Sequence, residues 1–320
     1  MARSHLTLAA LATSAVAGLD LAATATFGSH GDNDFDSALL TGRDGKHWII
    51  RVPRNERSEA EQSADLVALR ALSAGVRARL PFAVSAYAGQ VPIDGTRGIV
   101  YEFVYGTKAH LDDLEVGQDS LSGSIGRAIA AIHSLPTSFV ADAGLPVLTP
   151  IESLRSAVGI MDRAASTSLV PAALLGRWEK ATEDTALWQY QPTVVNNTLT
   201  ADSFLVQGDE VTGLLGWHEL RVADPARDLC WLLASTDTDA SQAALDAYNT
   251  ARGTIDRQVG QRAKLYSELE VAKWLLHGTQ ERSTEIVDDA VAMLTAIVDD
   301  VESDVMGVLG KQTFGEQRAG

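Results

Sequence analysis

The chain has 320 residues, 46% of them hydrophobic and 21% charged, so it can bury a sizeable core and form two domains or lobes. Its formal net charge of −16 argues against binding to nucleic acid or to an anionic membrane. Such a surface suits a cationic small molecule or a basic partner, although acidity also serves solubility alone.

The first 25 residues allow two interpretations. An apolar run from Leu6 to Ala12 follows Arg3 and precedes small residues at 23–25, as in a signal peptide. Threonine and serine dilute this run, and Asp20 lies just before the supposed cleavage site. We therefore expect a helix here and a cytoplasmic protein. No other run in the sequence is long enough to span a bilayer.

Short β-branched and aromatic runs predict a sheet in the next eighty residues. The expected strands are 22–27, 38–41, 47–53 and a pair within 91–105, which is joined across Asp94-Gly95-Thr96. Gly42-Arg43-Asp44-Gly45 is a hairpin turn signal. The aspartates of loop 28–36 lack the glycine and the closing glutamate of an EF-hand, so we reject a calcium loop. Residues 58–74 have helical periodicity, and Ser58-Glu59-Ala60-Glu61 predicts a capping box.

Most of the remaining chain has a helical pattern. The expected helices are 121–135, 152–165, 172–184, 240–253, 261–278 and 283–309. We expect Trp178 and Trp188 to pack in the core, the alternative being a ligand pocket.

The stretch 192–233 has a different pattern. Strands are expected at 193–195, 204–206 and 211–217, two of them paired as a hairpin, with polar loops between them. Asp224-Pro225 then breaks the chain, and the apolar residues of Ala226–Ala234 predict a buried helix. This helix holds the single cysteine, Cys230, which excludes an internal disulfide and is expected to be buried.

Two segments resemble the aminoglycoside and macrolide phosphotransferases, which have a protein-kinase-like fold. Ile125–Pro136 looks like the core helix of that family, with His133 as a structural residue near its end. The second segment keeps the frame of the family's catalytic loop in Leu199, Phe204-Leu205-Val206, Gly213-Leu214-Leu215, Trp217 and Asp224-Pro225-Ala226-Arg227-Asp228-Leu229. The resemblance implies a two-lobed α+β fold, with a small β-rich N-lobe over residues 1–105 and a larger helical C-lobe over residues 106–320.

The resemblance also implies nucleotide contacts in the N-lobe. Arg51 stands where the family has a phosphate-contacting basic residue, and Asp65, or alternatively Glu61, where an acidic helix residue pairs with it. A solvated surface charge is the competing interpretation for each. The hinge whose backbone binds the purine would be formed by Glu102, Phe103 and Val104. By descent the ligands would be ATP or GTP and an aminoglycoside- or macrolide-like molecule.

The catalytic groups of that family are replaced in this chain. Asn196, Asn197 and Thr198 occupy the His-Gly-Asp positions, Ser203 the metal-binding asparagine position, and Gly216 the second metal-ligand aspartate position. Phosphoryl transfer needs a carboxylate to orient the acceptor hydroxyl and oxygen ligands to hold magnesium. A hydroxyl is no base near neutral pH, serine is a weak ligand, and glycine has no side chain. We therefore expect a pseudokinase without an intact metal site.

Some polar residues around the loop are kept. In the family, the positions of Asp224 and Asp228 brace the catalytic loop and cap the next helix. Three residues are candidate substitutes for the lost groups, namely Asp202, His218 and Glu219. Two functions thus stay open: a protein that acts by binding a nucleotide or small molecule, and an active small-molecule kinase that uses a substitute group. The sequence points to no particular oligomer.

Overall fold

The computed structural model describes residues 3–28, 34–117, 119–235, 237–253 and 256–298. The chain forms two compact units. The first comprises Met1–Val147, Thr193–Val222 and Ser235–Ile255, and the second comprises Leu148–Pro192, Ala223–Ala234 and Asp256–Gly320. The predicted α+β class is confirmed, with a sheet-rich N-terminal region and a helical C-terminal region. The lobe boundary expected at residues 105 and 106 stays a prediction.

An antiparallel five-stranded sheet forms the N-terminal part of the first unit, in the order β1-β2-β3-β6-β5. Its strands are β1 (Leu21–Thr26), β2 (Phe35–Gly42), β3 (His47–Pro53), β5 (Tyr87–Ile93) and β6 (Thr96–Glu102). Gly45 and Gly95 take positive φ angles of 78° and 83° in the two tight turns. Both turns lie where the sequence predicts them, because glycine adopts this conformation without steric cost.

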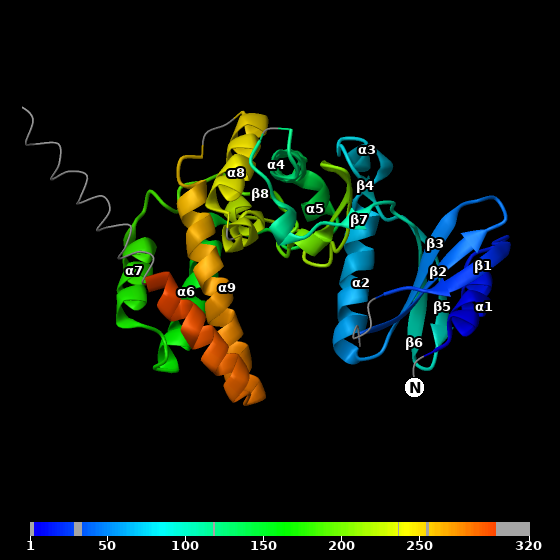
Figure 1. Ribbon diagram of the computed structural model, residues 1–320, viewed down its shortest axis with the longest axis horizontal. Coiled ribbons are helices and arrows are strands. Elements are labelled where there is room, and N and C mark those ends of the chain that lie inside the picture. The colour runs from blue at the N-terminus through cyan, green and yellow to red at the C-terminus, as the bar shows by residue number, and fades with distance from the viewer. Residues whose placement is uncertain (1–2, 29–33, 118, 236, 254–255, 299–320) are drawn as a thin grey trace, which may run out of the picture. The chain divides into compact units, whose positions relative to one another are not determined.

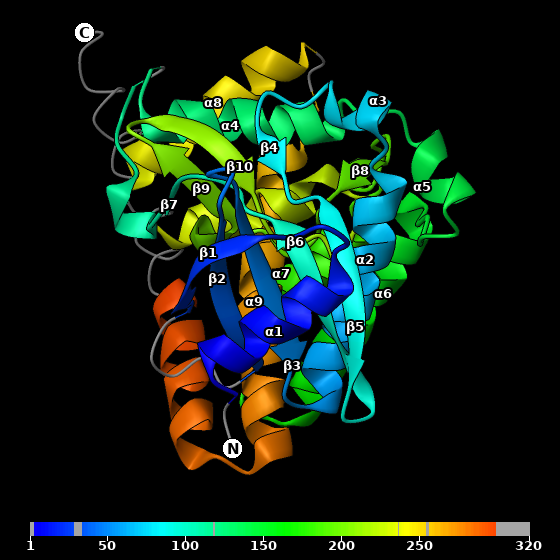
Figure 2. The same cartoon turned by 90° about the vertical axis from the view of Figure 1, so that its right-hand side faces the viewer.

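Helix α1 (His5–Ala15) covers one face of this sheet (Figures 1 and 2). Its buried residues Leu8 and Ala12 pack against alternate strand residues, namely Ala38, Leu40, Ile50, Val52 and Val100. Gly89 of β5 allows this close approach, since a Cβ atom there would lie 2.3 Å from the carbonyl oxygen of Ala15. The helix expected in this region is confirmed.

Helix α2 (Glu56–Ala71) lies on the other face of the sheet (Figure 1). The predicted capping box at Ser58-Glu59-Ala60-Glu61 is wrong, because the helix begins earlier, with Asn55 as its N-cap. The Asn55 side chain accepts the Ser58 amide at 2.8 Å, and the Ser58 hydroxyl accepts the Asn55 amide at 3.3 Å. Buried Gln62 then donates to the carbonyl oxygen of Arg51 at 3.1 Å, which fixes α2 against β3.

A second sheet of four strands, in the order β4-β10-β9-β7, belongs to the same unit. Its strands are β4 (Ala83–Val84), β7 (Thr107–Lys108), β9 (Phe204–Gln207) and β10 (Glu210–Leu214). Strand β8 (Thr193–Val195) pairs with β11 (Arg221–Ala223). The short elements are α3 (Ala74–Arg77), α5 (Ser138–Asp142), and the 3₁₀ turns η1 (Leu111–Asp113) and η2 (Ala201–Ser203). The predicted hairpin between β9 and β10 is confirmed.

Two helices of the first unit, α4 (Leu121–His133) and α8 (Thr238–Arg252), pack closely. At Gly126 an added Cβ atom would lie 2.2 Å from the carbonyl oxygen of Ala244. Nδ1 of buried His133 lies 2.9 Å from the hydroxyl of Tyr248. His133 therefore has a structural role in helix packing, as the sequence predicts.

The second unit contains the helices α6 (Pro150–Ser166), α7 (Ala172–Glu183) and α9 (Val259–Glu281), and a further helix over 284–298, where the described residues end. Trp178 donates to Glu268 at 2.9 Å and Trp188 to the carbonyl oxygen of Ala181 at 2.8 Å. Both indoles are buried, as expected for core residues. None of the helices in the described ranges is long and apolar enough to cross a membrane.

The predicted helix over Ala226–Ala234 is wrong. The chain forms two 3₁₀ turns instead, η3 (Pro225–Asp228) and η4 (Cys230–Ala234). The thiol of Cys230 donates to the carbonyl oxygen of Arg227, and the indole of Trp231 to that of Asp228. Side chains thus occupy acceptors that a continuous α-helix would use. Cys230 is buried, as expected, and burial raises the pKa of its thiol to about 11.

Candidate functional site

Asn196 connects the two halves of the segment that the resemblance aligns with the catalytic loop. It follows β8 and is fully buried. Its Nδ2 donates to the carbonyl oxygen of Gly216 at 2.6 Å, and its Oδ1 accepts the amide and the hydroxyl of Thr198 at 3.3 and 3.2 Å. One side chain therefore brings together the positions where the resemblance implies the orienting carboxylate and a metal ligand.

The backbone at two of these positions is left-handed. Asn197 has a φ angle of 76° and Gly216 one of 73°. Asparagine tolerates this conformation better than most residues, and glycine adopts it freely. A Cβ atom added to Gly216 would have no atom within 4 Å. The first atom of a side chain would therefore meet no neighbour at Gly216, but the left-handed φ angle would strain most residues there.

Ser203 is engaged in local structure. Its hydroxyl accepts the amide of Thr200 at 3.2 Å, closing η2, and its carbonyl oxygen accepts the amide of Leu215 at 2.9 Å. The second of these bonds joins the loop to the residue that follows β10. The hydroxyl thus stabilises the turn, and it would be only a weak neutral ligand for a metal ion.

The candidate substitute residues each contact another side chain. Asp202 pairs with Lys108 at 3.3 Å, and both are exposed. The carboxylate of Glu219 pairs with Arg221 and accepts the Asn197 side chain at 3.5 Å. Nδ1 of His218 lies 3.8 Å from the carboxylate of Glu61. In the part of the chain that the structure describes, no group of three or more histidine, cysteine or acidic residues is arranged to hold a metal ion.

Asp65 and Arg51 do not form the ion pair that the resemblance implies. The guanidinium of Arg51 lies over the ring of Phe35, 3.8 Å from its centroid, and Oδ1 of Asp65 accepts the amide of Trp217 at 2.7 Å. No ion pair joins Arg51 to Asp65 among the described residues. Burial raises the pKa of Asp65, against the opposing effects of the Trp217 amide and the charge of Arg51. Asp65 therefore fixes the backbone of Trp217, the residue that follows Gly216.

Asp65→Asn is expected to keep the protein at least as stable at neutral pH, because the amide oxygen can still accept the Trp217 N–H. Asp65→Ala removes that acceptor and should cost about 1–3 kcal/mol. The pKa of Asp65 is higher in the folded protein than in the unfolded chain, so the free energy of unfolding falls as pH rises from the unfolded pKa to the folded pKa. The wild type should therefore lose stability relative to Asp65→Asn over that range. Chemical denaturation across that range checks both. An equal loss in the two variants would contradict this role.

The predicted hinge has an unusual pattern of backbone hydrogen bonds. The amides of Glu102 and Phe103 donate to the carbonyl oxygens of Ala86 and His47, and the carbonyl oxygen of Tyr105 accepts the hydroxyl of Thr212. Within the described ranges, the N–H and C=O groups of Val104, which lies between them, form no hydrogen bond to the protein. One residue thus presents a donor and an acceptor, a combination that can bind the edge of a heteroaromatic base.

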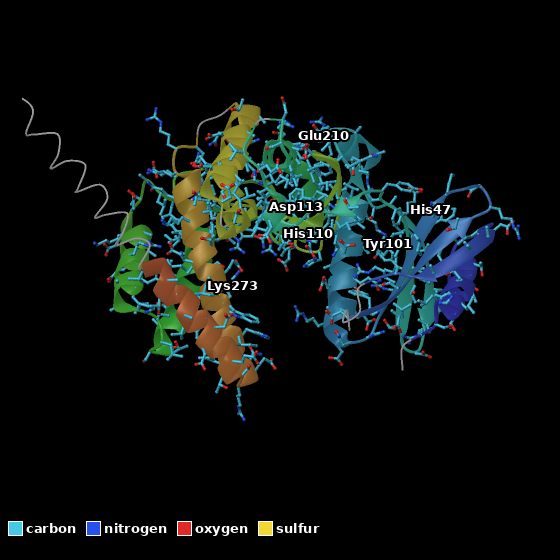
Figure 3. All side chains as sticks on the ribbon, in the orientation of Figure 1. His47, Tyr101, His110, Asp113, Glu210 and Lys273 are labelled. Atoms are coloured by element: carbon cyan, nitrogen blue, oxygen red, sulfur yellow. The ribbon has the colours of Figure 1, made fainter. Side chains whose placement is uncertain are left out.

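Four aromatic rings gather at this hinge, from Phe27, His47, Phe103 and Tyr105. Of these residues, the sequence predicts only Phe103 as part of the hinge, and it does not predict that the rings meet. Their centroids lie 5.0–6.1 Å apart in successive pairs. The sequence places these residues in separate segments, and only the pairing of β3 with β6 brings His47 next to the hinge. Figure 3 shows His47 on this sheet together with Tyr101 of β6.

In the second unit, Asp224 caps η3 by accepting the amide of Ala226 at 2.9 Å. Its other oxygen accepts Nε of Arg262 at 2.8 Å and the hydroxyl of Tyr266 at 3.1 Å. Asp228 is also buried. The capping role of Asp224 is confirmed for a 3₁₀ turn, whereas bracing of the catalytic loop by Asp224 and Asp228 stays a prediction.

A cavity of about 560 Å³ lies at the start of α2, away from these residues. Its lining includes Arg3, Asp36, Arg54 and Asp94, and none of the predicted site residues. Asp36 is paired with Arg54 and, at 3.0 Å, with Arg3. Burial raises the pKa of Asp36, but hydrogen bonds from both arginines outweigh it and hold the pKa below its usual range. The cavity therefore has a structural ion-pair network at its wall.

Comparison with known proteins identifies the family. Residues 28–266 match the model of the phosphotransferase enzyme family APH. The chain is 25% identical over 276 residues to the uncharacterized protein YcbJ of Bacillus subtilis strain 168, covering 81% of this chain and 87% of YcbJ.

Solved structures show the same fold. Macrolide 2'-phosphotransferase MphH from Brachybacterium faecium has a TM-score of 0.71 at 22% identity, with 91% of this chain and 98% of that chain covered. A GDP complex of aminoglycoside 2'-phosphotransferase-IIIa has a TM-score of 0.73 at 16% identity, with 92% and 98% covered. Because the family match spans well over half of the sequence, this chain belongs to the APH phosphotransferase family.

Proposed function

We propose that this protein is a pseudokinase of the APH family, which binds a nucleotide or another small molecule and has lost most or all phosphoryl transfer. One observation carries the proposal. Asn196 keeps the loop closed against Gly216, yet Thr198, Ser203 and Gly216 provide neither the orienting carboxylate nor the metal ligands. General-base catalysis contributes about 10²–10⁴-fold to a reaction, and a bound metal ion stabilises the transition state further, so the combined loss of rate should be several orders of magnitude.

The ligand classes follow from the relatives. Among the solved structures, one aminoglycoside phosphotransferase holds GDP together with kanamycin, others hold GDP or ADP, and one holds gentamicin. We infer a nucleotide-side role for Arg51 and Asp65, and for the hinge residues Glu102, Phe103 and Val104. The charge of −16 suits a cationic second ligand such as an aminoglycoside. We further propose a cytoplasmic protein without a nucleic-acid or membrane partner.

A second function is favoured by one contact. The carboxylate of Glu219 lies within 3.5 Å of the Asn197 side chain, beside the position of the missing base. An active phosphotransferase would then use Glu219, or Asp202 or His218, in place of the lost groups. Against this, the carboxylate of Glu219 is already engaged in an ion pair with Arg221.

Restoring the family residues tests the proposal. The variant Thr198→Asp/Ser203→Asn/Gly216→Asp should gain magnesium-dependent cleavage of ATP or GTP, because Asn196 still bonds the loop to residue 216 and no atom lies within 4 Å of an added Cβ there. Aspartate is one of the few side chains that adopt the left-handed φ angle of this position. The wild type should release or transfer no γ-phosphate above the protein-free rate, with kanamycin, gentamicin and a macrolide as acceptors. Transfer by the wild type that Glu219→Gln, Asp202→Asn or His218→Asn abolishes would instead support the active enzyme.

A further inference from the structure

Strand β1 is an end strand of the five-stranded sheet, and no described segment pairs with its outer edge (Figure 2). The amide of Phe27 donates to the carbonyl oxygen of Ser37 at 3.2 Å, and residues 23–26 pair with β2 in the same register. Because hydrogen-bonded and non-hydrogen-bonded pairs alternate in an antiparallel ladder, the N–H and C=O groups of Thr24 and Thr26 face away from β2. Within the described ranges these groups form no hydrogen bond. The edge therefore offers alternating donors and acceptors to an incoming strand.

This edge lacks the features that usually keep a sheet edge from pairing. Natural edge strands are commonly protected by lysine, by proline or by a bulge. The opposite edge strand, β5, has both Pro92 and a register shift. In β1 the register shift ends at Ala23, and residues 23–27 contain neither proline nor a charged side chain. This regular segment is also largely exposed, so it is open to pairing.

The surroundings of the edge are uncharged as well. From Ser4 to Gly28, a range that includes α1 and β1, the only charged side chain is Asp20 when histidine is neutral, whereas 21% of the whole chain is charged. Two molecules with a net charge of −16 repel one another, and this repulsion opposes contact least at an uncharged surface. Small side chains also form no pocket that would select a foreign peptide. These features favour a second copy of the chain as the partner.

We propose that β1 pairs with β1 of a second copy of this chain, antiparallel about a two-fold axis, and forms a homodimer with one continuous sheet. The axis passes beside Ala25, which faces its own equivalent. Thr24 and Thr26 exchange backbone hydrogen bonds with Thr26 and Thr24 of the second copy. Phe27, which is 43% exposed, lies opposite Ala23 of the second copy and covers this small side chain. The dimer goes beyond the proposed function and forms without any nucleotide.

Sedimentation velocity of the full chain at increasing concentration tests the proposal. The wild type is expected to shift from monomer to dimer as the concentration rises. Thr26→Pro should weaken dimerisation at least about tenfold, because each copy loses an outward donor and gains a ring at the edge. Proline costs the monomer no ladder bond, since the amide of Thr26 faces away from β2. Thr26→Val is the matched control, because it keeps the N–H and the branched shape and should dimerise like the wild type.

Two results of this experiment would contradict the proposal. A wild type that stays monomeric at every concentration overturns the dimer. Thr26→Pro that dimerises as tightly as Thr26→Val overturns the assignment of the interface to β1. Melting temperatures verify that both variants fold.

An introduced cysteine tests the register. In Ala25→Cys the two new thiols would face each other at a non-hydrogen-bonded pair, where Cα atoms lie about 4.5 Å apart, within the range that a disulfide bridges. The chain's own Cys230 is buried and should not compete. Oxidation should yield a covalent dimer of Ala25→Cys and little of Ala10→Cys, which replaces an exposed residue of α1. Equal cross-linking of the two variants, or none in Ala25→Cys, overturns this pairing.

Discussion

Replacement of Arg262 by methionine is expected to cost about 3–5 kcal/mol of unfolding free energy, because it leaves a buried carboxylate unpaired. Arg262 is fully buried and donates to Asp224 at 2.8 Å, to Asp256 at 2.6 Å and to the carbonyl oxygen of Leu187 at 3.1 Å. Burial lowers the pKa of this guanidinium, but the two carboxylates outweigh burial and hold it above its usual range. The side chain thus joins η3 to α9 as a permanent cation.

Two further variants separate the buried pair from a general loss of charge. Arg43→Met breaks the pair with Asp20 at 3.2 Å, whose side chains are about 70% exposed, and should cost less than about 1 kcal/mol. Asp224→Asn combined with Arg262→Met should recover part of the loss, since no buried charge then stays unpaired. Urea denaturation measures the free energy of unfolding of Arg262→Met, of Arg43→Met and of the double variant. A cost for Arg262→Met as small as that for Arg43→Met would show that the network does not hold the second unit together.

Gly126→Ala is expected to destabilise the first unit by about 1–3 kcal/mol, although alanine is the better helix former. The new Cβ atom would lie 2.2 Å from the carbonyl oxygen of Ala244 and 2.9 Å from the amide nitrogen of Tyr248. Both atoms belong to the backbone of α8, so relief requires the helices to separate. The bond between His133 and Tyr248 would be strained by the same movement.

Gly159→Ala is the matched control for this substitution. Gly159 also lies inside a helix, α6, but an added Cβ atom there has no neighbour within 4 Å. The variant should therefore gain up to about 1 kcal/mol from helix propensity. Thermal unfolding of the two variants gives opposite signs if packing at Gly126 limits the approach of α4 and α8. A gain in both would contradict this explanation.

The strands and most helices follow from local chemistry in the sequence. The run His47–Pro53 and the turn glycines at 45 and 95 have strong local preferences, and the structure keeps them. The segment Ala226–Ala234 shows where such reasoning fails. An apolar run predicts burial, but it does not distinguish an α-helix from the two 3₁₀ turns that form, in which the Cys230 and Trp231 side chains donate to carbonyl oxygens.

The candidate site also has some features that the sequence predicts and others that only the fold shows. The replacement of the family's catalytic groups at Thr198, Ser203 and Gly216 is a prediction made from the sequence alone. Asn196, by contrast, looked like one more degenerate position, and only the fold shows that it bonds to residues 198 and 216. Asp65 was expected to pair with Arg51, yet its carboxylate accepts an amide 152 residues away in the chain. Such long-range contacts leave no local signal.

The absence of a working metal site is the central claim, and the magnesium dependence of nucleotide binding tests it most directly. Melting temperatures would be recorded with ATP and with GTP, each with and without magnesium. A ligand at about 100 times its dissociation constant adds about 2.7 kcal/mol to the folded state, so binding is readily measured. We predict that magnesium changes neither the shift in melting temperature with ATP nor that with GTP. A shift that appears only with magnesium would contradict the claim, because some carboxylate would then have replaced the lost ligands.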